Sequence, residues 1–94
     1  MADSVYTRNR TVAISTATTT VVKSGTGMLA SITILGGTLG AITVYDNTAA
    51  SGTTICPAFT PAAGSMETLT FNVGFTTGLT IVTAAATVLQ VSYQ

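Results

Sequence analysis

Few side chains of this 94-residue chain could carry out acid–base or nucleophilic chemistry. The chain has no histidine, a single cysteine at position 56, and only three acids, Asp3, Asp46 and Glu67. General acid–base catalysis at neutral pH usually depends on histidine or on carboxylates with shifted pKa values. Asp46 and Glu67 each lie in or beside a run of turn-forming residues, and Asp46 with Asn47 is expected to start a turn by capping its own backbone. The sequence therefore predicts no active site, and we do not expect an enzyme.

Cys56 is equally poor as a nucleophile or a metal ligand. It stands between Ile55 and Pro57, and the chain has no histidine that could deprotonate its thiol. A small buried hydrophobic side chain is the expected role. One cysteine and three scattered acids cannot build a metal site within one chain, and the glycines at Gly25 and Gly27 lack the G-K-[ST] ending of a phosphate loop. No catalytic, cofactor-binding or metal-ligating residue is predicted.

Charge is scarce along the whole chain. Only three basic and three acidic residues are present, and the net charge is zero, whereas an ordinary soluble domain devotes about a quarter of its residues to charged side chains. Charged side chains keep protein monomers apart in water, so a chain without them is suited to an assembly. Nucleic-acid binding is not expected, because phosphate contacts require many lysines and arginines.

The first ten residues differ from the rest of the chain. Residues 1–10 are polar, contain both arginines, and precede the first alternating run. We expect an N-terminal arm here, with Tyr6, Arg8 and Arg10 as candidate docking residues. An arginine can donate two parallel hydrogen bonds to a carboxylate, and tyrosine and arginine are enriched at protein interfaces. A frayed terminus is the alternative interpretation.

The rest of the chain shows the alternation of β-strands. Threonine, a β-branched residue, supplies about a fifth of the chain. Short β-rich runs separated by turn-forming clusters predict an all-β fold over residues 11–94, an antiparallel β-sandwich resembling a jelly roll, with about eight strands and essentially no helix. The expected strands are Thr11–Ser15, Thr18–Lys23, Met28–Leu35, Ala41–Tyr45, Thr53–Phe59, Met66–Val73, Leu79–Thr83 and Thr87–Tyr93.

The uncharged segment from Ser24 to Tyr45 could also be interpreted as a membrane-spanning helix, because about 20 apolar residues suffice for one. However, Gly36 and Gly37 interrupt it, and its two halves alternate with a period of two. We therefore expect strands and no membrane partner. The residues expected to share buried faces are Ala30, Ile32 and Ile34; Ile42 and Val44; Leu69, Phe71 and Val73; and Leu89, Val91 and Tyr93.

Two segments and the C-terminal stretch carry a resemblance to a known family. The first segment consists of Thr20–Leu29 followed by Ile42–Thr53, and it contains V-Y-D-N at Val44–Asn47 and A-S-G-T at Ala50–Thr53. The second contains F-T-T-G-L-T-I-V at Phe75–Val82, and V-S-Y follows near the C-terminus. With these motifs, residues 11–93 resemble the small β-sandwich module of tailed-bacteriophage virion proteins. The motifs are structural and identify no functional residue.

The resemblance implies a function that agrees with the scarcity of charge. In that family the module occurs as a free-standing capsid decoration or cement protein, and also within head fibres and tail proteins. A chain of this length without fibre repeats is most similar to the decoration form. The implied partners are the major capsid protein and further copies of the chain, as a homotrimer in preference to a homodimer. The implied location is the capsid surface of the virion, after synthesis in the host cytoplasm.

Two other functions stay open at this point. A head-fibre, spike or tail component involved in host attachment would be expected to show clustered aromatic residues, whereas Tyr6, Tyr45 and Tyr93 are dispersed and tryptophan is missing. An adhesin-like or carbohydrate-binding sandwich outside viruses ranks last, because residues 1–10 lack the apolar stretch of an export signal.

Overall fold

The computed structural model describes residues 10–61 and 66–94, which form eight strands and no helix. Each of the eight predicted strands is present, with ends that differ from the prediction by two residues at most. The strands are β1 (Arg10–Ile14), β2 (Thr18–Ser24), β3 (Gly27–Gly37), β4 (Ile42–Tyr45), β5 (Thr54–Phe59), β6 (Glu67–Phe75), β7 (Gly78–Thr83) and β8 (Thr87–Tyr93).

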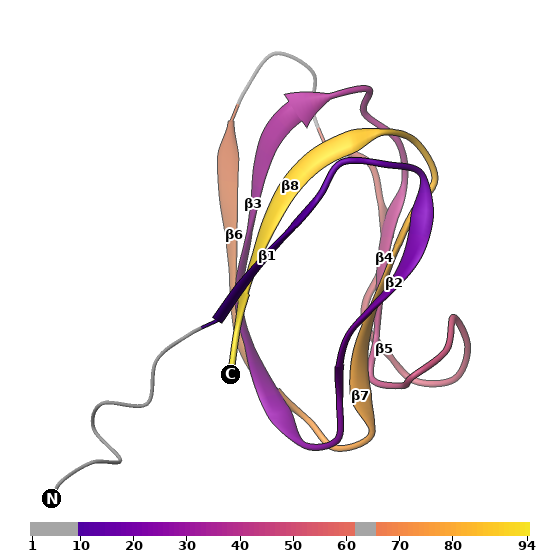
Figure 1. Ribbon diagram of the computed structural model, residues 1–94, viewed down its shortest axis with the longest axis vertical. Coiled ribbons are helices and arrows are strands. Elements are labelled where there is room, and N and C mark those ends of the chain that lie inside the picture. The colour runs from indigo at the N-terminus through magenta and orange to yellow at the C-terminus, as the bar shows by residue number, and fades with distance from the viewer. Residues whose placement is uncertain (1–9, 62–65) are drawn as a thin grey trace, which may run out of the picture.

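The strands form two four-stranded antiparallel sheets packed as a sandwich (Figure 1). Sheet A has the order β1-β8-β3-β6, and sheet B has the order β2-β7-β4-β5. The first strand thus pairs with the last, the second with the next to last, and so on inward to β4 and β5. This is the order that results when a long hairpin is wrapped into two sheets, the jelly roll. The predicted all-β antiparallel sandwich is confirmed.

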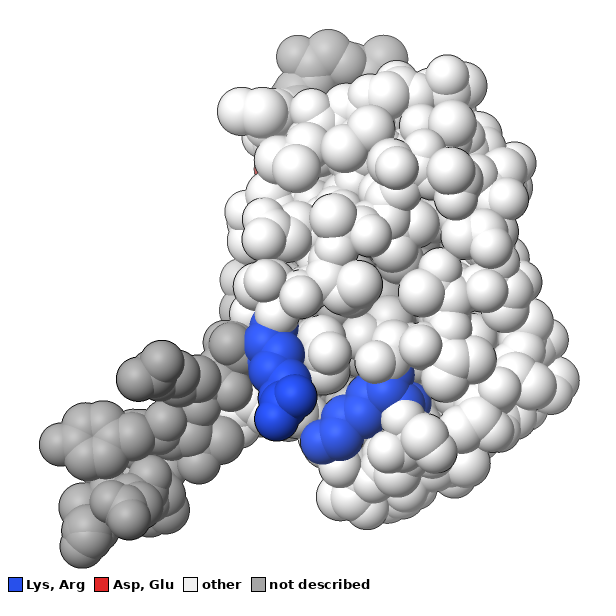
Figure 2. Space-filling view, viewed as in Figure 1, with Lys and Arg blue, Asp and Glu red and all other residues white. Residues whose placement is uncertain are grey.

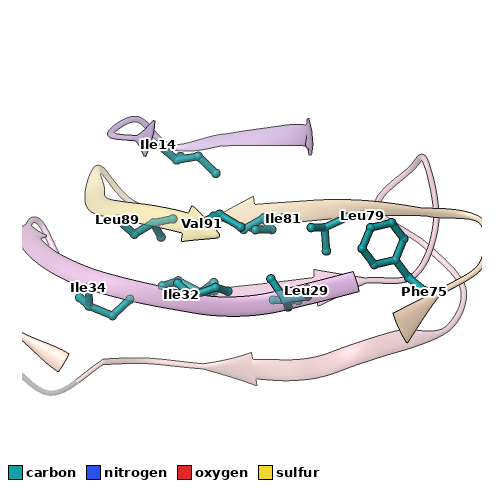
Figure 3. Packing of buried hydrophobic residues seen from close by; sticks show 11 residues of the cluster. Ile14, Leu29, Ile32, Ile34, Phe75, Leu79, Ile81, Leu89 and Val91 are labelled. Carbon is teal, nitrogen blue, oxygen red and sulfur yellow. The ribbon is translucent and has the colours of Figure 1, made fainter. Parts of the chain in front are cut away.

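The core lies between the two sheets and is built from the alternating residues of the inner strands (Figure 3). A β-strand points successive side chains to opposite faces, so a run that alternates hydrophobic and polar residues buries every second side chain. Side chains from sheet A and sheet B are drawn together in Figure 3, where Ile32 and Leu89 come from sheet A and Ile81 from sheet B. The fully buried residues that confirm the predicted faces are Ile32, Ile34, Ile42, Val44, Leu89 and Val91.

Strand β6 departs from the predicted pattern at its C-terminal end. The expected strand ended at Val73, but β6 continues through Phe75, which is 1% exposed. Val73, predicted to share the buried face of Leu69, is instead 38% exposed. The register between β3 and β6 shifts near this point, and Asn72 has a φ of 50°. Such bulges displace the alternation locally, and a period-two pattern alone does not reveal them.

Three buried threonines tie the loops of the sandwich to its strands. Thr80, Thr83 and Thr87 are the buried polar residues of the described chain, with exposures of 0%, 3% and 0%. The hydroxyl of Thr80 donates to the carbonyl of Asn47 at 2.6 Å, that of Thr83 to Thr16 at 2.6 Å, and that of Thr87 to Thr38 at 2.8 Å. A buried hydroxyl without a hydrogen-bond partner lowers the stability of the fold. Each of these hydroxyls has a partner, and each also supplies a donor to the carbonyl oxygen of a loop residue.

The segment that could have been interpreted as a membrane helix, Ser24–Tyr45, contains the end of β2 and all of β3 and β4. Within residues 10–61 and 66–94, no helix has the length and apolar character needed to cross a membrane.

Candidate functional site

The carboxylate of Asp46 is the most heavily hydrogen-bonded charged group of the described residues. Asp46 follows β4, and its Oδ1 accepts from the backbone N–H of Thr77 at 2.9 Å and of Thr76 at 3.1 Å. Oδ1 also accepts from Gly78 N–H at 3.4 Å, and Oδ2 accepts from the Thr76 hydroxyl at 3.4 Å. Asp46 thus holds the turn between β6 and β7, which begins 30 residues further along the chain.

The prediction that Asp46 caps its own backbone is wrong, and the neighbouring Asn47 has that role. Asn47 Oδ1 accepts from the backbone N–H of Thr48 at 2.8 Å, and its Nδ2 donates to the carbonyl of Ser51 at 2.8 Å. Aspartate and asparagine share this turn chemistry, so local sequence does not decide between them. The β6–β7 turn competes for Asp46 because three successive backbone N–H groups, those of Thr76, Thr77 and Gly78, point at the carboxylate and favour an anion.

These contacts give the two motifs behind the family resemblance a common structural role. V-Y-D-N supplies Asp46 and Asn47, while F-T-T-G-L-T supplies the three backbone donors and Thr80, which donates to the Asn47 carbonyl. Gly78 is required where they meet. A Cβ on this residue would lie 2.9 Å from the Lys23 carbonyl oxygen and 3.0 Å from that of Asn47. The motifs therefore clamp one end of the sandwich.

The chemistry of Asp46 is that of a fixed anion. Hydrogen bonds from the backbone, above all from the N–H of Thr77, hold the pKa of Asp46 below its ordinary value although partial desolvation opposes them. An aspartate so stabilised in its charged form does not exchange protons near neutral pH, as a general acid or base must. In the described part of the chain, no three potential ligands among cysteine and acidic residues come together to hold a metal ion.

Cys56 lies on β5 opposite Val44 and packs against the core. It was predicted to be buried, and the structure leaves it half-buried. Desolvation raises the pKa of its thiol, which keeps it protonated at neutral pH and lowers its reactivity. The geometry therefore supports a packing role for this residue.

Of the three candidate docking residues of the arm, Tyr6 and Arg8 lie outside the described residues. Arg10 is the first residue of β1 and is exposed, and its Cα partner in the antiparallel pair is Tyr93 of β8. The structure therefore places Arg10 on the edge of sheet A, at the end of the sandwich where β8 ends.

Three of the four described charges lie on edge strands, a placement that sequence reasoning missed. Arg10 lies on β1, Lys23 on β2 and Glu67 on β6, and the remaining edge strand, β5, contains Pro57. Unpaired edge strands invite other strands to add to them, and charged residues or proline on an edge oppose this. The few charges of the chain thus protect the edges, and the strand order needed to see this is not visible in the sequence.

The outer face of sheet A carries no charge and is called the neutral face here. Two rows of side chains cross all four strands of the sheet, joined by Cα pairing from β1 to β6. None of these side chains is buried, and the hydroxyls of Thr33 and Thr68 are 3.1 Å apart and hydrogen-bonded. The rows are Thr11, Ser92, Ser31 and Thr70, and Ala13, Gln90, Thr33 and Thr68.

The neutral face can contact another protein without removing charges from water. Desolvating an unpaired charge costs far more than desolvating a hydroxyl or amide that finds a hydrogen-bond partner. Interface cores are correspondingly depleted in charged residues. Short Thr, Ser, Ala and Gln side chains can donate and accept hydrogen bonds and also pack closely. The arrangement is suited to association.

Figure 2 shows the distribution of charge on the side of the molecule where β1 and β2 lie. The basic side chains, in blue, lie at the same end of this view, and almost all of the remaining described surface in it is uncharged. The described basic residues are Arg10 and Lys23. Lys23 was expected to be a solvated charge at the end of a strand, and it does close β2, where it is half-buried.

A comparison of the chain with family models, curated proteins and solved structures found no match among any of them.

Proposed function

We propose that this chain is a structural protein of a bacteriophage virion that decorates and stabilises the assembled capsid by bridging neighbouring capsid subunits. The observation that carries the proposal is the neutral face, a four-stranded surface without charge, in a sandwich whose edge strands are protected. This combination favours association with another protein through the outer face of sheet A. It disfavours the addition of further strands at the sheet edges. The resemblance of the two clamped motifs to virion β-sandwich modules supports the same function, as does the use of jelly rolls in viral capsids.

The proposed mechanism is stabilisation by selective binding. A protein that binds the assembled lattice and not the free subunits shifts the equilibrium toward the lattice by mass action. Contacts that are weak individually become strong when symmetry repeats them over a shell. The partners are the major capsid protein and other copies of this chain, as a homotrimer, and the chain acts at the capsid surface after synthesis in the host cytoplasm.

The number of copies in purified virions, measured by quantitative mass spectrometry, tests this function. Hundreds of copies, in a multiple set by icosahedral symmetry, are expected for a cement protein. A handful of copies, in threes or sixes, would instead indicate a head-fibre, spike or tail component involved in host attachment. Absence from virions would refute both.

The stabilising role has a separate test. Capsids that lack this chain should withstand heating less well than the same capsids after the purified protein is added back. Saturation should occur at a fixed ratio of protein to capsid subunit, because each lattice position offers one site. Binding that leaves the temperature of capsid disassembly unchanged would contradict the cementing mechanism.

A further inference from the structure

The described cations lie together on one margin of the sandwich. β1 and β2 are the edge strands of sheets A and B on this margin, and the three residues 15–17 join them. β5 and β6 are the edges on the opposite margin. Arg10 on β1 and Lys23 on β2 therefore share a margin, while Glu67 on β6 belongs to the other. Figure 2 shows both cations at one end of their margin, and we call this pair the basic margin.

No acid within the described chain neutralises the basic margin. Arg10 and Lys23 form no ion pair with any residue of 10–61 or 66–94. Asp46 is the acid at the end of the sandwich where β2 ends, but its carboxylate accepts hydrogen bonds from Thr76, Thr77 and Gly78. Among the described residues, no acid therefore competes with an external anion for these two basic groups.

We propose that Arg10 and Lys23 form a docking surface for an acidic protein surface that presents clustered Asp or Glu carboxylates. The argument is charge complementarity: because the chain has no net charge, attraction to an acidic partner requires a local cluster of cations, and Arg10 and Lys23 are the cations of the described residues. This inference rests on the proposed function, in which the acidic surface belongs to a capsid subunit. It adds Lys23 to Arg10 as a docking residue.

The test is an NMR titration of the ¹⁵N-labelled full-length protein with poly-L-glutamate at low salt. Amide shifts are expected to concentrate at residues 10–12 and 21–24, and to disappear at high salt because screening weakens exposed ion pairs. Arg10→Gln and Lys23→Gln should each weaken binding about threefold to fivefold, as expected for one exposed ion pair. Shifts spread evenly over the protein, or centred on another surface, would overturn the inference.

A variant of matched charge separates the position of the cation from net charge. Lys23→Gln combined with Thr54→Lys keeps the net charge of the wild type but moves the cation to exposed Thr54 of β5, on the opposite margin and outside the neutral face. This double variant should bind poly-L-glutamate as weakly as Lys23→Gln alone. Recovery of wild-type affinity would show that net charge alone decides binding, and would refute a docking surface at the basic margin.

The same variants distinguish failure of this inference from failure of the proposed function. If the wild type binds capsids and Lys23→Gln binds them equally well, the basic margin is not the docking surface although the capsid function stands. If poly-L-glutamate binds at residues 10–12 and 21–24 but capsids do not bind the wild type, the acidic-partner inference stands and the partner lies elsewhere.

Discussion

Replacing Thr83 with valine tests whether buried hydroxyls hold this sandwich together. Thr83 is 3% exposed, and its hydroxyl donates to the Thr16 carbonyl at 2.6 Å while accepting from the backbone N–H of Thr18 at 3.1 Å. Valine has nearly the same shape but can make neither hydrogen bond. Each lost bond costs about 1 kcal/mol net, and a buried group left unpaired costs more. Because Thr16 and Thr18 are exposed and water can reach their backbone groups, we expect a total loss of about 2 kcal/mol.

Urea and thermal unfolding of Thr83→Val and Thr83→Ser measure this loss. For a chain of this size, 1 kcal/mol corresponds to about 4–8 °C in melting temperature, so the valine variant should melt about 8–16 °C below the wild type. Serine keeps the hydroxyl and loses one methyl group, which costs about 1 kcal/mol.

Amide hydrogen exchange at Thr18 separates the hydrogen-bond effect from packing. Exchange should accelerate in the valine variant beyond its loss of global stability, because the acceptor of that N–H is gone, and it should not do so in the serine variant. The reasoning would be refuted if valine were as stable as the wild type, or if serine destabilised the protein as much as valine.

Three further predictions concern the clamped end of the sandwich and the cysteine. Asp46→Asn should lower the melting temperature at pH 7 and lower it progressively less on acidification, because the lowered pKa of Asp46 stabilises the fold above the ordinary aspartate pKa. This contribution disappears as the pH falls through the lower folded-state pKa, and an effect that does not change with pH would contradict this reasoning. Gly78→Ala should destabilise the protein by about 1–3 kcal/mol in urea unfolding through overpacking, whereas in the control Gly74→Ala the new Cβ meets only an atom 3.7 Å away. Half-buried Cys56 should react with a thiol reagent at least about tenfold more slowly in the native protein than in urea, and equal rates would refute its packing role.

Strand positions and buried faces could be predicted because they depend on local sequence. The alternation of Ile32 and Ile34 with Ser31 and Thr33 is enough to predict a strand and to indicate which side chains are buried. The reason is that successive side chains of a β-strand point to opposite faces of the sheet. The prediction was wrong at Val73, where a shifted register changes burial without any marked change in composition, and it ended this strand two residues before Phe75.

The contacts of Asp46 illustrate what local sequence could not predict. A turn-forming aspartate before Asn47 has its own backbone close by, yet its carboxylate binds Thr76 and Thr77, which only the packing of the two sheets brings near. The same holds for Lys23, whose place beside Arg10 depends on β1 and β2 being edge strands on one margin.

The amino-acid sequence by itself determined the strands, the alternation that builds the core, and the scarcity of charge. The tertiary structure decided which strands are edges, how Thr33 and Gln90 join into a neutral face, and where the few charges lie. The physical reason is that alternation with a period of two is compatible with many strand orders. The jelly-roll order is selected by the pairing of strands that are distant in sequence, which forms together with the closed core. This pairing also decides where the neutral face and the charged edge strands lie.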